Sequence, residues 1–212
     1  SIRSTISQWK FPLIFLDFET INPAIPRYDH TTPYQQVPFQ FSVHQLNSIN
    51  SQPIHWEYLH TDSTDPRPPL IEALLKACGT EGSIVAYYSQ FESGRISEMA
   101  DFTKEQSQEL KALLERIVDP LPLIRETVYD KSFGCSFSLK AVAPSILGES
   151  QSYEGMLVAN GTAAQRAFEE LISEQTTPQR KSELIQASLE YCKKDTLVMV
   201  ELVKWLYSQT DL

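Results

Sequence analysis

PLIFLDFE, residues 12–19, is the stretch that decides how this chain folds. Its apolar residues fill both faces of an extended chain, which is typical of a strand buried on both sides. Side chains two positions apart share one face of a strand, so Asp17 and Glu19 face one side and Phe18 the other. Two carboxylates on one face repel each other, and divalent cations would relieve that cost. For this pair alone, the alternative is a strand that simply ends in two solvated acids.

The rest of the chain predicts a mixed sheet covered by helices. Further strands are predicted at residues 38–46, 54–60 and 83–89, the first two joined by a polar turn typical of an antiparallel hairpin. Helices are predicted at residues 70–78, 91–102, 103–117, 138–148, 161–173 and 178–208, with a cap at Thr103 and Gly148 ending the fourth. Residues 118–130 fit either a short strand or a helix broken by prolines, and residues 130–137 fit a loop. A meander of three strands, followed by alternating helix and strand, indicates an α/β domain with about five strands.

Length and composition are those of one ordinary globular domain spanning residues 1–212. The chain begins without Met and almost directly with a strand, so we expect it to be excised from a longer protein with an additional domain. Three well-separated cysteines, Cys78, Cys135 and Cys192, indicate a reducing compartment and argue against a zinc site. The chain shows neither an apolar run near the roughly 20 residues that span a bilayer nor a signal-peptide pattern. We therefore expect a cytoplasmic protein with no membrane partner.

The formal net charge of −9 disfavours tight binding to long duplex nucleic acid, which usually needs a basic surface. It leaves a nuclease open, because a carboxylate cluster that binds divalent cations is acidic by necessity. An enzyme that grips only a few terminal nucleotides also needs few phosphate contacts.

Two later segments carry residues that complement the acidic pair. Glu92 follows the strand predicted at residues 83–89, and taken alone it is better explained as an acid at a helix N-terminus. Tyr191 and Asp195 are four positions apart on the last helix, so they share a face. Taken alone, they are better explained as a tyrosine at the margin of the core and a surface aspartate paired with a lysine. Their combination and order indicate a metal site.

In this order, the motifs LDFET (16–20), YYSQFE (87–92) and YCKKDT (191–196) resemble those of the DEDD exonuclease superfamily, which is ribonuclease-H-like. In the third motif, a tyrosine (Tyr191) rather than a histidine precedes the aspartate, and this resembles the tyrosine branch of that superfamily. More closely, the chain resembles a bacterial family known as domain of unknown function 2779, which has the LDFET, FE-G-R, RIVD and YC-x-x-DT landmarks. Two departures from the superfamily concern the second motif. Glu92 replaces the usual aspartate, and Tyr88 or Ser89 occupies the region where an asparagine is common.

The resemblance implies phosphodiester hydrolysis with two divalent ions, Mg²⁺ or Mn²⁺. Asp17 would bridge both ions, and Glu19 and Asp195 would complete the first site. Glu92 would support the second site through water, and Tyr191 would orient the attacking water.

Four further residues are expected near the substrate. By analogy with the superfamily, the backbone at Thr20 and Ile21 would lie close to the terminal nucleotide. Lys140 could meet a phosphate, although a helix-surface lysine is the commoner explanation. Arg95, one turn beyond the second motif, could hold its carboxylate or a phosphate. Asp119 ends another apolar stretch and receives no role.

The expected function is that of a 3′→5′ exonuclease acting on the 3′ end of single-stranded DNA or RNA. One alternative is a structure-specific endonuclease with the same metal chemistry. Another is a catalytically weak module of the same fold that binds nucleic acid or serves as a scaffold, and the intact set of acids counts against it.

Overall fold

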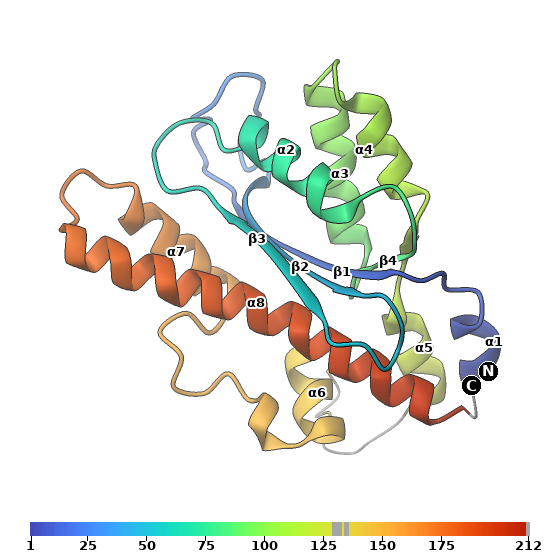
Figure 1. The fold of residues 1–212 in the computed structure, drawn as a ribbon. Coiled ribbons are helices and arrows are strands. Elements are labelled where there is room, and N and C mark those ends of the chain that lie inside the picture. The colour runs from blue at the N-terminus through green and yellow to red at the C-terminus, as the bar shows by residue number, and fades with distance from the viewer. Residues whose placement is uncertain (129–132, 134–135, 211–212) are drawn as a thin grey trace.

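The sheet is built around β1 (Leu13–Ile21), the strand that contains the opening stretch. A computed structural model describes residues 1–128, 133 and 136–210, and in it five strands form a mixed, open sheet with helices on both faces (Figure 1). The other strands are β2 (Val37–Leu46), β3 (Ile54–Leu59), β4 (Ile84–Val85) and β5 (Ile117–Val118), in the spatial order β3-β2-β1-β4-β5. The first three strands form an antiparallel meander, whereas β4 and β5 run parallel to β1. The predicted α/β class and the initial meander are confirmed.

Helices cover the two faces of the sheet in two groups (Figure 1). One face carries α2 (Arg67–Cys78), α3 (Gln90–Phe102) and α4 (Ser107–Leu114). The other face carries α1 (Ile2–Ile6), α5 (Pro120–Thr127), α6 (Leu139–Leu147) and the long α8 (Pro178–Ser208). A 3₁₀ turn (Glu149–Gln151) follows α6, and α7 (Gly161–Leu171) packs on both α8 and β1. Helix α1 lies beside the end of α8 at one end of the sheet, where the Tyr207 hydroxyl donates to the carbonyl of Ile6 over 3.3 Å.

The alternation of side chains along β1 brings its two acids to the α8 face. Leu16 and Phe18 are buried in the apolar cluster that contains α2, α3 and α4. Phe15 is buried on the opposite face, against α8, and Asp17 and Glu19 continue that face. The register of the pairing with β2 shifts directly after Glu19, and the ladder then continues through Thr20 and Ile21.

Three details of the predicted elements are wrong. The strand predicted at residues 83–89 pairs only over β4, because the chain turns away at Tyr88, whose φ of 61° lies in the left-handed region. The helix predicted at residues 103–117 is limited to α4, and Thr103 ends α3 instead of capping the next helix. Ile117 and Val118 leave that helix because they pair with β4 as strand β5. The short helix α1 is an element that was not predicted.

Local signals at helix ends were more reliable. The predicted helix at residues 178–208 coincides with α8, with Thr177 as its N-cap and Pro178 in its first turn. α6 ends before Gly148, whose φ of 101° favours glycine. The ambiguous residues 118–130 contain α5, with Pro120 at its start. The loop prediction at residues 130–137 lies largely outside the described residues. Across the described ranges, every helix is too short or too polar to cross a bilayer.

Candidate active site

Four carboxylates from three elements meet where β1 faces α8. Asp17 and Glu19 come from β1, Glu92 from the first turn of α3 and Asp195 from the middle of α8. Burial raises the pKa of Asp17 well above its ordinary value, and the negative charges of the other three acids raise it further. Such effects act strongly only between groups a few ångströms apart. Among the described residues, ligand atoms of Asp17 and Glu19 lie within 4.8 Å of each other, and Asp195 and Glu92 lie near enough for their charges to raise the pKa values of both. These four acids are called the acid cluster below.

The cluster is costly in the absence of a cation. The carboxyl group of Asp195 raises the pKa of Asp17, whereas Asp17 lowers the pKa of Asp195 against the effect of burial. Burial raises the pKa of Glu19 and of Glu92 to about 8. Glu92 is 3% exposed, and its Oε2 atom has no hydrogen-bond partner among the described residues. Like charges and an orphaned acceptor therefore share a space that water hardly reaches.

One lysine and two tyrosines line the cluster on the α6 side. The Tyr153 hydroxyl donates to Oδ1 of Asp195, and Nζ of Lys140 donates to the Tyr191 hydroxyl over 2.6 Å. The Lys140 ammonium also lies 4.7 Å from the ring centre of Tyr191 and 5.1 Å from that of Tyr153. Burial and the neighbouring carboxylates raise the pKa of Tyr191, so its phenol stays protonated. Tyr191 and Asp195 therefore face the same space, together with a cation.

Cys192 adds a thiol to the same cluster. Its Sγ lies 3.9 Å from Oδ2 of Asp17, and Asp17, Glu19 and Cys192 offer ligand atoms within 4.8 Å of one another. Burial and the neighbouring carboxylates raise the pKa of Cys192 well above its ordinary value, so it remains a neutral thiol. The available donors are then carboxylate oxygens, which suit hard cations such as Mg²⁺ or Mn²⁺. Cys78 is buried in the core, and Cys135 lies outside the described residues.

A buried polar layer sets the position of α8 on the sheet. The Thr196 hydroxyl makes hydrogen bonds of 2.7 Å to both Ser42 and His44 of β2. Burial lowers the pKa of His44 to about 3, so its ring stays neutral. Because Thr196 adjoins Asp195, these bonds determine which turn of α8 faces the acids of β1.

Asp119 builds the turn from which Glu92 emerges. Its carboxylate accepts hydrogen bonds from the backbone N–H groups of Tyr88 at 3.1 Å and Ser89 at 2.7 Å. It also accepts from the N–H of Leu121 at 2.9 Å, where it is the N-cap of α5. These bonds support the left-handed conformation of Tyr88, which is uncommon for a residue with a side chain. Asp119 thus links the starts of α5 and α3.

Asp119→Ala should lower the free energy of unfolding by about 1–3 kcal/mol, because it removes a helix cap and two further acceptors for backbone N–H groups. Urea unfolding of the metal-free protein measures the change. Asp119→Asn retains one acceptor oxygen and should lose less than the alanine variant. Equal stabilities of Asp119→Ala and the wild type would contradict the linking role.

A cavity of about 310 Å³ opens beside Glu19. The start of α7 forms one wall, since a Cβ atom built on Gly161 would lie 3.9 Å from Oε2 of Glu19. The positive end of the helix dipole at that point favours a nearby negative group. The cavity is lined by Phe18, Glu19, Thr20, Asn22, Gln36, Phe91, Gly161, Thr162 and Gln165.

Thr20 and Ile21, the two residues predicted beside a terminal nucleotide, differ in whether their side chains reach the cavity. Thr20 lines the cavity, and its hydroxyl donates to Oε1 of Gln36. The side chain of Ile21 is fully buried against Phe39 and Phe168, so only its backbone is available.

The two basic residues predicted near the substrate also lie in different places. Lys140 belongs to the acid cluster and lowers the pKa of Glu19, against the effect of burial. Arg95 forms an ion pair of 2.7 Å with Glu98, and its charge only moderates the raised pKa of Glu92. Arg95 lines a second cavity instead.

Tyr153 and Cys192 belong to the site but were not predicted. Cys192 is three residues before Asp195 on the same helix, so its position on the site face was available from helical periodicity. Tyr153 lies in an irregular segment between α6 and α7, and no spacing connects it with the acid motifs.

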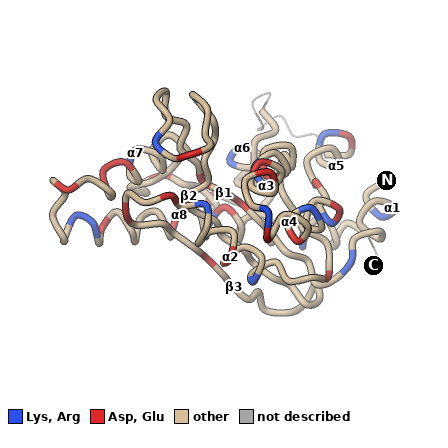
Figure 2. The backbone as a smooth tube through the Cα atoms, turned by 90° about the horizontal axis from the view of Figure 1, so that it is seen from above, with Lys and Arg blue, Asp and Glu red and all other residues tan. Residues whose placement is uncertain are grey.

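Charged positions are interspersed across the described backbone. In the view of Figure 2, Lys and Arg positions alternate with Asp and Glu positions over helices and loops on all sides of the sheet. Lys140 supplies a local positive charge at the acid cluster, since it contacts Tyr191 and lowers the pKa of Glu19.

The chain is similar in sequence to one protein family and to three bacterial proteins. A family model described as Domain of unknown function (DUF2779) matches residues 14–138, which include Asp17, Glu19 and Glu92. The chain is 26% identical to "Uncharacterized protein MG366 homolog" of Mycoplasma pneumoniae, 24% to "Uncharacterized protein MG366" of Mycoplasma genitalium and 23% to "Uncharacterized protein UU173" of Ureaplasma parvum. These similarities cover 94%, 96% and 93% of the chain but 33%, 33% and 31% of the relatives. The chain thus spans about a third of the length of these relatives.

Proposed function

The chain belongs to the family described as Domain of unknown function (DUF2779), and we propose that it is a metal-dependent 3′→5′ exonuclease acting on single-stranded DNA or RNA. One observation carries the proposal. Carboxylates from β1, α3 and α8 face one partly buried space, where ligand atoms of Asp17 and Glu19 lie within 4.8 Å of each other and the charges of Asp195 and Glu92 raise the pKa values of both. A protein gains nothing in stability from such an arrangement, but two divalent cations would make it favourable.

The donor set fits Mg²⁺ or Mn²⁺. The orphaned Oε2 atom of Glu92 is an acceptor that a cation, or water on that cation, would satisfy. Asp17, whose pKa is raised by all three other acids, would help to hold both ions. Glu19 and Asp195 would complete the first site, and Glu92 would support the second.

The residues around the acids would position the reactants. When bound, the cations would supply the positive charge that activates water and stabilises the leaving 3′ oxygen. Tyr191, held at its hydroxyl by Lys140, would orient the water rather than act as a base, because its pKa is raised above the ordinary value near 10. Tyr153 holds the Asp195 carboxylate through a hydrogen bond. The Lys140 ammonium lies where it can meet a phosphate oxygen.

The sheet supports a ribonuclease-H-like fold. The pattern of predicted elements indicated about five strands that begin with a meander, and the motifs resemble those of a ribonuclease-H-like superfamily. The order β3-β2-β1-β4-β5, with β4 and β5 parallel to β1, has that arrangement. The first motif on the central strand and the third on the last helix agree with it as well.

The test is a nuclease assay on 5′-labelled single strands of DNA and RNA with the same base sequence, in Mg²⁺, Mn²⁺ or EDTA. We expect stepwise shortening from the 3′ end with either cation and none in EDTA. A blocked 3′ end should protect the strand, and internal cleavage of the blocked strand would instead identify an endonuclease. Metal-dependent binding without cleavage of either strand would identify a binding module.

A further inference from the structure

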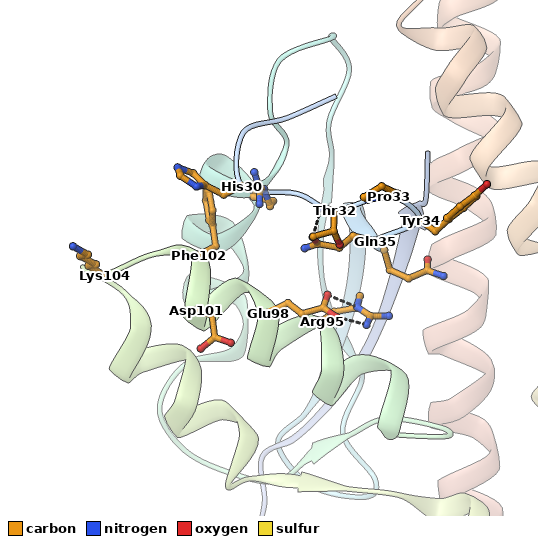
Figure 3. Close-up of a pocket in the computed structure, with 12 residues that line it drawn as sticks. His30, Thr32, Pro33, Tyr34, Gln35, Arg95, Glu98, Asp101, Phe102 and Lys104 are labelled. Atoms are coloured by element: carbon orange, nitrogen blue, oxygen red, sulfur yellow. Dashed lines mark hydrogen bonds and ion pairs between the residues drawn. The ribbon is translucent and has the colours of Figure 1, made fainter. Parts of the chain in front are cut away.

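A second and larger cavity adjoins the one beside Glu19. Its volume is about 940 Å³, and it is bordered by a loop that follows β1, by α3 and the residues after it, and by the start of α2 (Figure 3). Gln36 lines both cavities, and Thr20 holds it by a hydrogen bond. A strand whose 3′ end lies at the acids could therefore continue past Gln36 into the larger space.

The larger cavity is preformed, because Arg67 fastens its loop to the helices. Arg67 is 3% exposed, and its Nη2 donates to the carbonyl of Asp29 over 2.5 Å. The same guanidinium pairs with Asp65 at 2.7 Å and lies 3.8 Å from the centre of the Phe102 ring. Because these contacts occupy its guanidinium group, Arg67 holds the cavity wall in place and does not offer its charge to a ligand. A wall that is already ordered lowers the entropy cost of binding a ligand.

Tyr34 presents an exposed aromatic ring at the edge of this cavity. The residue is 69% exposed, and its backbone adopts the left-handed conformation with φ of 61°. Its N–H donates to the carbonyl of Pro23 over 3.0 Å, which supports this uncommon conformation. Tyr34 and Lys104 lie at opposite ends of the cavity (Figure 3). An exposed ring of this kind offers a face on which any nucleobase can stack.

The charges of the cavity are balanced, which favours bases over a highly charged ligand. Arg95 is paired with Glu98, as the dashed lines in Figure 3 show. Within the described ranges, Lys104 and Asp101 form no ion pair. Asp101 can accept from the amino group of a base, and Lys104 can meet one backbone phosphate.

We propose that this cavity is a subsite for the nucleotides that precede the 3′-terminal nucleotide of a single strand, with one base stacked on Tyr34. The inference rests on the proposed function and specifies its substrate. It requires an unpaired strand of several nucleotides, because a base inside a duplex does not offer its face to an aromatic side chain.

The test measures kcat/KM in Mn²⁺ on 5′-labelled single strands of increasing length, starting from a dinucleotide. For the wild type we expect kcat/KM to rise with length and then level off. Tyr34→Ala should lose about 5- to 150-fold on the longer strands, the range that base–aromatic stacking covers, and nothing on the dinucleotide. Tyr34→Phe keeps the ring and should match the wild type. Trp56→Ala removes an aromatic residue of β3 that is 40% exposed, as a matched control that should change nothing.

Two results would overturn the subsite while leaving the nuclease intact. In the first, kcat/KM of Tyr34→Ala rises with strand length as it does for the wild type. In the second, Tyr34→Ala loses as much kcat/KM on the dinucleotide as on the longer strands. Failure of the wild type to hydrolyse strands of any length would instead overturn the proposed function. Fluorescence anisotropy of labelled strands in Ca²⁺ examines the cavity separately. Weaker binding of long strands by Tyr34→Ala would support the subsite, and equal affinities would overturn it.

Discussion

Asp17→Ala and Asp195→Ala should each abolish hydrolysis, lowering kcat by roughly 1,000-fold or more. Each change removes carboxylate oxygens that would hold a cation from the acid cluster, where the two carboxyl groups act on each other's pKa. The loss should exceed that of any residue that only positions the reactants. Single-turnover hydrolysis of a single-stranded oligonucleotide in Mn²⁺ measures it.

Glu190→Gln is the matched control for these variants. Glu190 is an exposed acid on the same helix as Asp195, and its Oε1 accepts a hydrogen bond of 3.1 Å from Gln186. Its replacement removes one negative charge without touching the cluster, so hydrolysis should stay at the wild-type level. If Asp17→Ala is as active as the wild type, the acid cluster is not the catalytic site.

Glu92→Gln should stabilise the metal-free protein at alkaline pH while lowering hydrolysis. Burial raises the pKa of Glu92 from 4.5 to about 8, and Asp119 and Asp195 add to the shift. Below about pH 4.5 the carboxyl is protonated in the folded and the unfolded protein, and its full contribution to stability is present. As pH rises toward 8 the unfolded chain releases this proton and the folded protein keeps it, so that stability is lost. Glutamine has no proton to lose and escapes this penalty.

Urea unfolding in EDTA at pH 5 and pH 8.5 measures the effect. The advantage of Glu92→Gln should grow by about 2–4 kcal/mol from the lower pH to the higher, since one pKa unit corresponds to about 1.4 kcal/mol. Mn²⁺ should reduce the difference in free energy of unfolding between Glu92→Gln and the wild type, because a bound cation would stabilise the wild-type carboxylate. Glu190→Gln should show no such dependence on pH. An advantage of equal size at both pH values would contradict the buried, charge-coupled position of Glu92.

Features set by neighbouring residues could be predicted from the sequence. β1 follows from an apolar run, and the shared face of Asp17 and Glu19 follows from the two-residue period of a strand. The start of α8 follows from Pro178 in its first turn, and its length follows from continuous helical periodicity. The order of the acid motifs also indicated which four carboxylates to consider, although each of them alone looked like a solvated or capping acid.

Features that depend on contacts between distant segments could not be predicted. β4 and β5 pair over two residues each, and such short parallel strands exist only because β1 lies beside β4. Lys140 looked like a surface lysine until the packing of α6 on α8 brought it to Tyr191. Asp119 is linked to the start of α3 only by hydrogen bonds to backbone groups about 30 residues earlier.

The opening strand of this protein and its pair of acids were therefore determined by the sequence itself, because strand periodicity is a local property. The side chains that surround those two acids were decided by tertiary structure. Glu92, Asp195 and Tyr153 reach them from other elements, and hydrogen bonds between α8 and β2 set the turn of the helix that meets them. The cavity beside Tyr34 likewise exists only because Arg67 fastens a loop to helices that lie far from it in the chain.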